Sequence, residues 1–190
     1  MDFILVTDST EDLNSLIKAA SAAGWRVRKH IGLNDEASLS VKEMHPDAVV
    51  FVSDEVDSQT LKEMKAITED SPVPIVVMTQ DNSQGAIDAA IQAGCTTYVV
   101  DCADPQRIGS LLQVAKAKFS ETRRLSIELE KTRNELNDRK STDRAKGIIM
   151  QARGLSEDEA YKALRKLAMD KNKRIGEIAE QIIAAAEILV

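Results

Sequence analysis

Apolar runs and amphipathic stretches alternate along the first part of the chain. Five short stretches predict β-strands, at residues 3–7, 25–31, 48–52, 74–79 and 97–100. Between the strands, apolar side chains recur with helical spacing, as in Leu13, Leu16, Ile17 and Ala20. The third stretch is apolar throughout, which is typical of a parallel strand covered on both faces. The pattern predicts an α/β domain with a doubly wound five-stranded parallel sheet, and its functional edge should lie at the C-terminal ends of the strands.

A long helix is expected to follow the sheet domain. After Pro105, no Pro or Gly other than Gly109 interrupts the chain before Gly147. Further along, residues step by four and three positions, which is the spacing of a coiled-coil seam; they are Leu125, Leu129, Thr132, Leu136 and Arg139. We expect Leu125, Leu129 and Leu136 to form a dimer seam. A solvated connector that packs on its own domain is the alternative.

The last third of the chain predicts three helices of one small bundle. The first should start near Ser141 and end at Gly154, because glycine tolerates the left-handed conformation that caps a helix. Ser156 and Glu159 have the spacing of a capping box, which would start the second helix. Asn172 separates the second helix from the third. The apolar positions expected to share a core are Ile148, Ile149, Ala152, Ala160, Leu164, Leu167, Ala168, Ile175, Ile178, Ala179, Ile182 and Ile183.

Charge divides the chain in the same way as the predicted elements. We expect an α/β domain at residues 1–120, a linker helix at 121–140 and an all-α domain at 141–190. Residues 139–174 hold eleven Lys and Arg against five Asp and Glu, a local net charge of +6 in a chain of net charge −6. A solvated helix surface would account for such a basic run, and so would a surface that binds nucleic acid.

Three separated motifs within the last third resemble the ANTAR domain, an RNA-binding module of bacterial antitermination regulators. They are Ala145-Lys146-Gly147-x-Ile149-Met150, then Glu157-x-x-Ala160-Tyr161-x-x-Leu164-Arg165, then Ile178-Ala179-x-x-Ile182. The resemblance implies that the basic residues contact RNA, with Lys146 and Arg165 facing solvent. Tyr161 is a candidate for stacking on a base, although a half-buried core position is favoured. The expected RNA contacts are Arg144, Lys146, Arg153, Arg165, Lys166, Lys173 and Arg174.

The first domain resembles a response-regulator receiver domain, which has a flavodoxin-like fold. Receivers need an acidic pair after the first strand, an Asp that accepts phosphate at the end of the third, a hydroxyl at the end of the fourth and a Lys at the end of the fifth. This chain has one acid at Asp8, Val52 at the acceptor position, Thr79 at the hydroxyl and Asp101 at the Lys, while Asp54 lies two residues past the acceptor. Phosphoryl transfer depends on charges placed around the transferred group. We therefore expect a degenerate phosphorylation pocket and no enzyme activity.

The resemblances imply an RNA-binding transcription antiterminator that binds hairpins of a structured leader RNA as a homodimer. The chain is also similar to NasT-type regulators of nitrate and nitrite assimilation, which implies control by a ligand-sensing partner protein similar to a nitrate-binding sensor. A DNA-binding response regulator of a two-component system is the alternative, although the expected third helix is too apolar for a recognition helix. A purely protein-binding adaptor would leave the basic surface unused.

Other classes of function find little support in the sequence. Cys95 and Cys102 are too far apart for a C-x-x-C pair, and His30 and His45 stand alone, so we expect reduced thiols, no metal site and no cofactor. The sequence contains no apolar run near the roughly 20 residues of a membrane span. The N-terminus lacks the basic start of a signal peptide, so a cytoplasmic location is expected.

Overall fold

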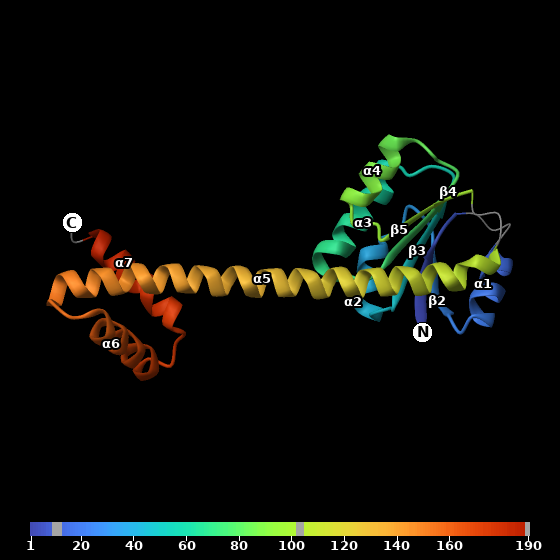
Figure 1. Cartoon of the computed structure of the whole chain (residues 1–190). Helices are drawn as coiled ribbons and strands as arrows, with labels where there is room; N and C mark the ends of the chain where they lie inside the picture. The colour runs from blue at the N-terminus through green and yellow to red at the C-terminus, as the bar shows by residue number, and fades with distance from the viewer. Residues whose placement is uncertain (9–12, 102–104, 189–190) are drawn as a thin grey trace. The chain divides into compact units, whose positions relative to one another are not determined.

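The computed structural model describes residues 1–8, 13–101 and 105–188, and the chain divides into two compact units, Met1–Arg123 and Arg124–Val190 (Figure 1). The unit boundary lies within the helix that the sequence predicts as a linker. The elements follow in the order β1 (Asp2–Val6), α1 (Leu13–Ala22), β2 (Arg26–Ile31), α2 (Ala37–Met44), β3 (Ala48–Ser53), α3 (Ser58–Asp70), β4 (Ile75–Thr79), α4 (Gln84–Gln92), β5 (Thr97–Val100), the 3₁₀ helix η1 (Pro105–Arg107), α5 (Ile108–Arg153), α6 (Glu157–Asp170) and α7 (Ile175–Ile188).

The N-terminal unit contains the predicted sheet. Its strands lie in the order β2-β1-β3-β4-β5, and every neighbouring pair is parallel. The register places Ser53 opposite Thr79 at the ends of β3 and β4. The order reverses after β1, so β1 and β3 flank the point where ligands usually bind in such sheets. The predicted doubly wound fold is confirmed.

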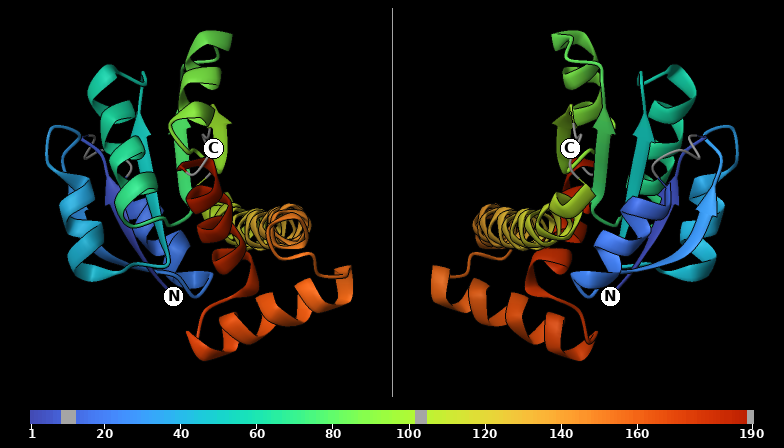
Figure 2. Two further views of the ribbon diagram at one scale, coloured as in Figure 1. Left: turned by 90° about the vertical axis from the view of Figure 1, so that its left-hand side faces the viewer. Right: turned by 90° about the vertical axis from the view of Figure 1, so that its right-hand side faces the viewer.

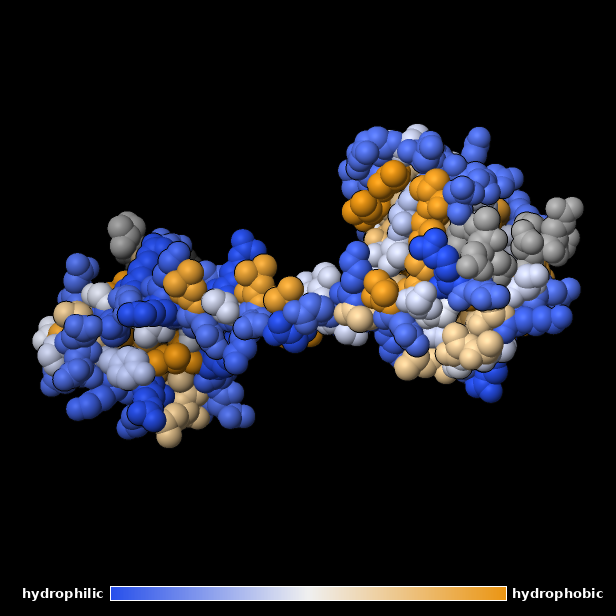
Figure 3. Space-filling view, turned by 45° about the vertical axis from the view of Figure 1, so that its right-hand side comes forward, coloured by the Kyte–Doolittle hydropathy of each residue, from blue (hydrophilic) through white to orange (hydrophobic). Residues whose placement is uncertain are grey.

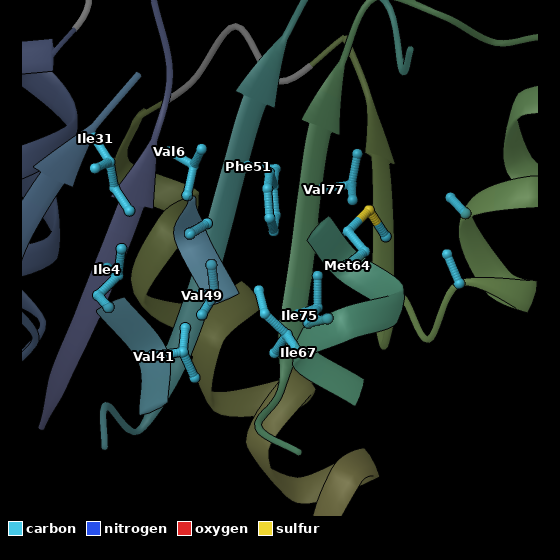
Figure 4. Packing of buried hydrophobic residues seen from close by; sticks show 13 residues of the cluster. Ile4, Val6, Ile31, Val41, Val49, Phe51, Met64, Ile67, Ile75 and Val77 are labelled. Carbon is cyan, nitrogen blue, oxygen red and sulfur yellow. The ribbon is translucent and has the colours of Figure 1, made fainter. Parts of the chain in front are cut away.

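Helices cover both faces of the sheet (Figure 2). On one face, α2, α3 and α4 pack on alternate strand residues, including Val49, Phe51 and Val77, and Figure 4 shows this cluster from close by. On the other face, α1 and the start of α5 pack on the remaining strand residues, such as Leu5 and Val50. Burial on both faces explains why the inner strands β1, β3 and β4 are largely apolar rather than alternating, whereas the edge strand β2 is mostly exposed and carries charges.

The start of α5 is fixed to the N-terminal unit by packing and by charge. Ile108, Leu112 and Ala115 are fully buried. At the next residue, the Lys116 ammonium lies 2.8 Å from a carboxylate oxygen of Asp47. These contacts make the first turns of α5 the last helix of the sheet domain.

The C-terminal unit is a three-helix bundle formed by the end of α5 with α6 and α7 (Figures 1 and 2). Gly154 ends α5 with a φ of +66°, as the sequence predicts. The Ser156 hydroxyl accepts from the Glu159 backbone N–H while the Glu159 carboxylate accepts from Ser156, which confirms the capping box. A side chain at Gly176 would collide with Asp138, so this glycine allows α7 to lie close against α5. The buried core residues are Ala145, Leu164, Ala168, Ile178 and Ala179.

Two details differ from the sequence prediction. The helix expected to begin near Ser141 has no separate start, because α5 runs without a break from Ile108 to Arg153. Gly147 does not interrupt it, since a single glycine costs only about 1 kcal/mol among good helix formers. Ala152 and Leu167 were expected in the core and are exposed instead. Among the residues described, no helix is both long and apolar enough to cross a membrane.

Candidate functional site

The predicted phosphorylation pocket lies at the C-terminal edge of the sheet, where each of its residues has a different contact. Asp8 is exposed after β1, and its Oδ1 accepts a hydrogen bond from the Leu33 backbone N–H at 2.9 Å. The Thr79 hydroxyl is buried; it donates to the Asp54 carbonyl at 2.8 Å and accepts from the Asp81 N–H at 3.1 Å. The hydroxyl therefore connects two loops of the protein itself.

A hydrophobic residue, Val52, occupies the position of the phosphate-accepting Asp. Val52 is half-buried and packs against the hydrophobic cluster beneath α1 and α5. The strand continues one residue beyond it, to Ser53, whose hydroxyl is buried without a hydrogen-bond partner in the described structure. Asp54 follows the strand as an exposed residue. The carboxylate closest to the acceptor position in sequence thus lies beyond the strand.

The position that holds Lys in receivers also lacks a cation. Asp101 follows β5 with a φ of +53°, and its backbone N–H donates to the Thr79 carbonyl at 3.0 Å. Nearby, the Tyr98 hydroxyl donates to the Asp81 carbonyl at 2.8 Å. Burial raises the pKa of the Tyr98 phenol, and the Asp81 charge adds to this. Within residues 1–8, 13–101 and 105–188, no three His, Cys, Asp or Glu side chains are grouped so that they could hold a metal ion.

The basic residues of the C-terminal unit fall into two groups. Three of the seven predicted RNA contacts are in ion pairs within the unit. Arg144 pairs with Glu187 at 2.9 Å. Arg174 lies 3.0 Å from Glu177 and 3.7 Å from Asp138. These exposed pairs contribute about 0–1 kcal/mol each, so the cations could exchange them for phosphates at little cost.

Lys146 differs from what the sequence suggests. Its side chain is only 15% exposed, so the expectation that it faces solvent is wrong. The Nζ atom lies 2.8 Å from Asp143 and 2.6 Å from Glu157, and these hydrogen bonds raise the pKa of Lys146. Two carboxylates already offset its charge. Lys146 is therefore better placed to join α5 to α6 than to bind phosphate.

The other predicted contacts are exposed, and none has an ion pair among the residues that the structure describes; they are Arg153, Arg165, Lys166 and Lys173. Arg165 and Lys166 lie on the outer face of α6. Tyr161 is on the same helix and is 43% exposed, so it lies at the surface and not in the core, where it was expected. We define the outer α6 face as Tyr161, Lys162, Arg165, Lys166 and Met169, all of which are exposed.

Two members of the outer α6 face were not predicted from the sequence. Lys162 and Arg165 are three residues apart, and Arg165 and Met169 are four apart, which is the spacing of neighbours on a helix surface. Met169 is 71% exposed. Tracing these steps from Arg165 would have identified both. The combined face offers cations for phosphates and one aromatic ring for a base.

The predicted seam residues lie exposed along α5. Leu125, Leu129 and Leu136 are 50%, 69% and 53% exposed. Apolar side chains at this spacing form one stripe along a helix. Figure 3 shows hydrophobic residues that interrupt the otherwise hydrophilic surface of the C-terminal unit. The dimer seam remains a prediction, and this stripe is the surface on which it depends.

Comparisons with known proteins agree with both resemblances. Residues 130–183 match the ANTAR domain family. The transcriptional regulatory protein PdtaR of Mycobacterium tuberculosis is 26% identical over 161 residues, covering 84% of this chain and 78% of that protein. The nitrate regulatory protein of Klebsiella oxytoca is 38% identical over 73 residues, covering 38% of this chain and 18% of that protein.

Solved structures match the fold of the sheet domain. The chemotaxis response regulator CheY4 of Vibrio cholerae superposes with a TM-score of 0.52 at 19% identity, covering 60% of this chain and 97% of that one. The receiver domain of a modulated diguanylate cyclase from Desulfovibrio desulfuricans gives a TM-score of 0.55 at 14% identity, covering 64% and 97%. At these identities the likeness concerns the fold alone.

Proposed function

We propose that this chain, which joins a receiver-like domain to an ANTAR domain, is an RNA-binding transcription antiterminator. The observation that carries the proposal is the outer α6 face, where Tyr161 lies beside the exposed cations Lys162 and Arg165 inside the residues that match the ANTAR family. By binding a hairpin of a leader RNA, the domain would prevent a competing terminator hairpin from forming.

The chemistry of the outer α6 face suits a hairpin loop. Lys162, Arg165 and Lys166 can neutralise phosphates, which supplies affinity without reading sequence. Bases in an RNA loop are unpaired and can stack on an aromatic ring, whereas bases in duplex DNA cannot. An exposed tyrosine beside cations therefore favours a looped RNA over a duplex.

Control of this activity is proposed to come from a partner protein and not from phosphorylation. The contacts of Val52, Thr79 and Asp101 support this, because a half-buried valine stands at the acceptor position and an acid at the Lys position. A nitrate or nitrite assimilation operon and a nitrate-binding sensor are proposed from the similarity to the nitrate regulatory protein. A homodimer joined along the α5 stripe would bring two RNA-binding units to one transcript.

A gel-shift experiment with the full chain tests the proposal. The probes are a pool of RNA hairpins with one fixed stem and a randomised loop, and duplex DNA of the same sequences. We expect retarded RNA and no retarded DNA at the same protein concentration. Equal retardation of the DNA would favour a DNA-binding regulator, and no retardation of either would refute binding of nucleic acid.

A further inference from the structure

A groove opens in the C-terminal unit between the end of α5, α6 and α7. Its volume is about 470 Å³. Apolar side chains from all three helices line it, chiefly Ile148, Ile149, Ala152, Leu164, Leu167 and Ile182. Of these, Leu164 is fully buried, whereas Leu167 is 36% exposed and Ala152 is also exposed. The bundle thus leaves part of its apolar surface open to solvent.

Charged side chains stand among this apolar lining. Arg153 is the last residue of α5, and Lys166 and Asp170 lie on α6. None of the three has an ion pair with another described residue, and both cations are exposed. Lys166 also belongs to the outer α6 face. The groove therefore continues the surface that we propose for RNA, and its charge is suited to an anionic ligand with an apolar part.

We propose that this groove receives one unpaired base of the RNA loop, while Arg153 and Lys166 hold the phosphates on either side of it. This inference rests on the proposed RNA-binding function and assigns a site to it. A base has two flat apolar faces that suit the isoleucine and leucine lining, and the planar guanidinium of Arg153 can stack on a base as well as pair with phosphate.

The size of the groove favours a base over a helix from a partner protein. Pockets that enclose small ligands typically measure about 300–1,000 Å³, and this groove is within that range. A single turn of helix, about 10–12 Å wide and 5.4 Å long, already occupies on the order of 500 Å³. Helices that bind in grooves use anchors at i, i+4 and i+7, which extend over about two turns. The groove has room for about one turn of helix, which is less than such a helix needs.

Asp170 adds a hydrogen-bond acceptor to the lining of the groove. Its carboxylate can accept a hydrogen bond from an amino group such as cytosine N4 or adenine N6. Because Asp170 is exposed, its carboxylate can reach such a donor on the edge of an inserted base without being buried.

The test fills the groove without removing a cation. In the full chain, Ala152→Leu places a larger apolar side chain in the groove at an exposed helical position, where leucine is well tolerated. The matched control is Ala184→Leu, at an exposed position of α7 that does not line the groove. The probe is a hairpin enriched from the randomised pool by the wild-type chain.

Ala152→Leu should weaken binding of this hairpin about tenfold, as expected for the loss of one stacked base. Its salt dependence should stay unchanged, because no phosphate contact is lost. Ala184→Leu should bind like the wild type.

A scan of the loop with abasic nucleotides identifies the inserted base. At one position the abasic hairpin should bind the wild-type chain about tenfold more weakly, and Ala152→Leu should add no further loss, since both changes remove the same contact. If Ala152→Leu binds the intact hairpin like the wild type, or its loss adds to the abasic loss at every position, the base site is refuted while RNA binding stands. If the wild-type chain enriches no hairpin, the proposed function itself fails. If Ala152→Leu retains RNA and instead loses a partner protein, the groove is a protein-binding site.

Discussion

The Nζ atom of Lys146 lies 2.6 Å from a carboxylate oxygen of Glu157, and this ion pair joins α5 to the first turn of α6. Asp143, one turn before Lys146, approaches the same nitrogen at 2.8 Å. Lys146 is the least exposed of the paired cations in the described part of the C-terminal unit. Lys146 therefore links α5 to α6 across the turn at Gly154 and stabilises that turn.

Loss of Lys146 should be seen first in stability. Lys146→Ala leaves Asp143 and Glu157 without their shared cation, so α6 should open more readily and exchange its amide hydrogens faster. Lys140→Ala is the control, because Lys140 is exposed on the same helix and has no ion pair within the described residues. Hydrogen–deuterium exchange of α6 measures the difference. Equal exchange in both variants, together with weaker RNA binding by Lys146→Ala alone, would make Lys146 a phosphate contact after all.

The receiver-like domain should not take up phosphate. In the presence of magnesium and a small phosphodonor, the intact mass of the chain should stay unchanged, because Val52 occupies the acceptor position and Asp101 replaces the cation that offsets phosphate charge. A stoichiometric gain of one phosphoryl group on Asp8 or Asp54 would contradict the degenerate pocket.

The N-cap of α3 gives a pH-dependent contribution to stability. The Asp57 carboxylate accepts from the Thr60 N–H at 2.7 Å, and this hydrogen bond lowers its pKa below 3.8. A lowered folded-state pKa contributes stability that is present above the unfolded value and is lost as pH falls through the folded value. Asp57→Ala should therefore lower the free energy of unfolding by about 1 kcal/mol at neutral pH.

This difference should shrink as the pH falls below 3.8, the unfolded value for Asp57. Denaturant unfolding at several pH values measures it. Asp57→Asn is the matched variant, since asparagine caps a helix about as well without a titrating charge. A loss for Asp57→Ala that stays constant down to the lowest pH would show that the cap does not depend on the carboxylate charge.

The α5 stripe should determine the oligomeric state. In a seam, Leu129→Asp would bury an unpaired charge between helices, which costs several kcal/mol unless the chains separate. Light scattering should show a dimer for the wild type and a monomer for the variant. Ile127→Asp is the control, because Ile127 is also exposed but lies about 200° around the helix from Leu129. An unchanged mass for Leu129→Asp, or the same change for both variants, would exclude the stripe as the seam.

The sequence predicts some of these features because they depend on local chemistry. The inner strands β1, β3 and β4 are recognisable because burial on both faces makes them largely apolar, and the capping box depends only on the three-residue step from Ser156 to Glu159. The sequence predicted Lys146 to face solvent because its partner Glu157 lies beyond the turn at Gly154. The direction in which the chain leaves this turn brings the two side chains together, and the spacing of residues along the sequence does not show that direction. The sequence predicted Tyr161 to lie in the core because it adjoins Ala160, which is buried. A step of one residue turns the side chain by about 100° around the helix, and this brings Tyr161 to the surface. The groove arises from the packing of three helices, so no single stretch of sequence encodes it.

The outer α6 face should carry the salt-dependent part of RNA binding. Arg165→Ala should weaken hairpin binding about tenfold and reduce the slope of log affinity against log salt by about 1, because one phosphate contact releases about one counterion. The helix content should stay unchanged, since Arg165 is exposed and has no ion pair in the described structure. Lys140→Ala and Asp8→Ala, outside this face, should bind RNA like the wild type. If Arg165→Ala binds normally while Asp8→Ala abolishes binding, the RNA contacts the receiver-like domain and the assignment of the α6 face is wrong.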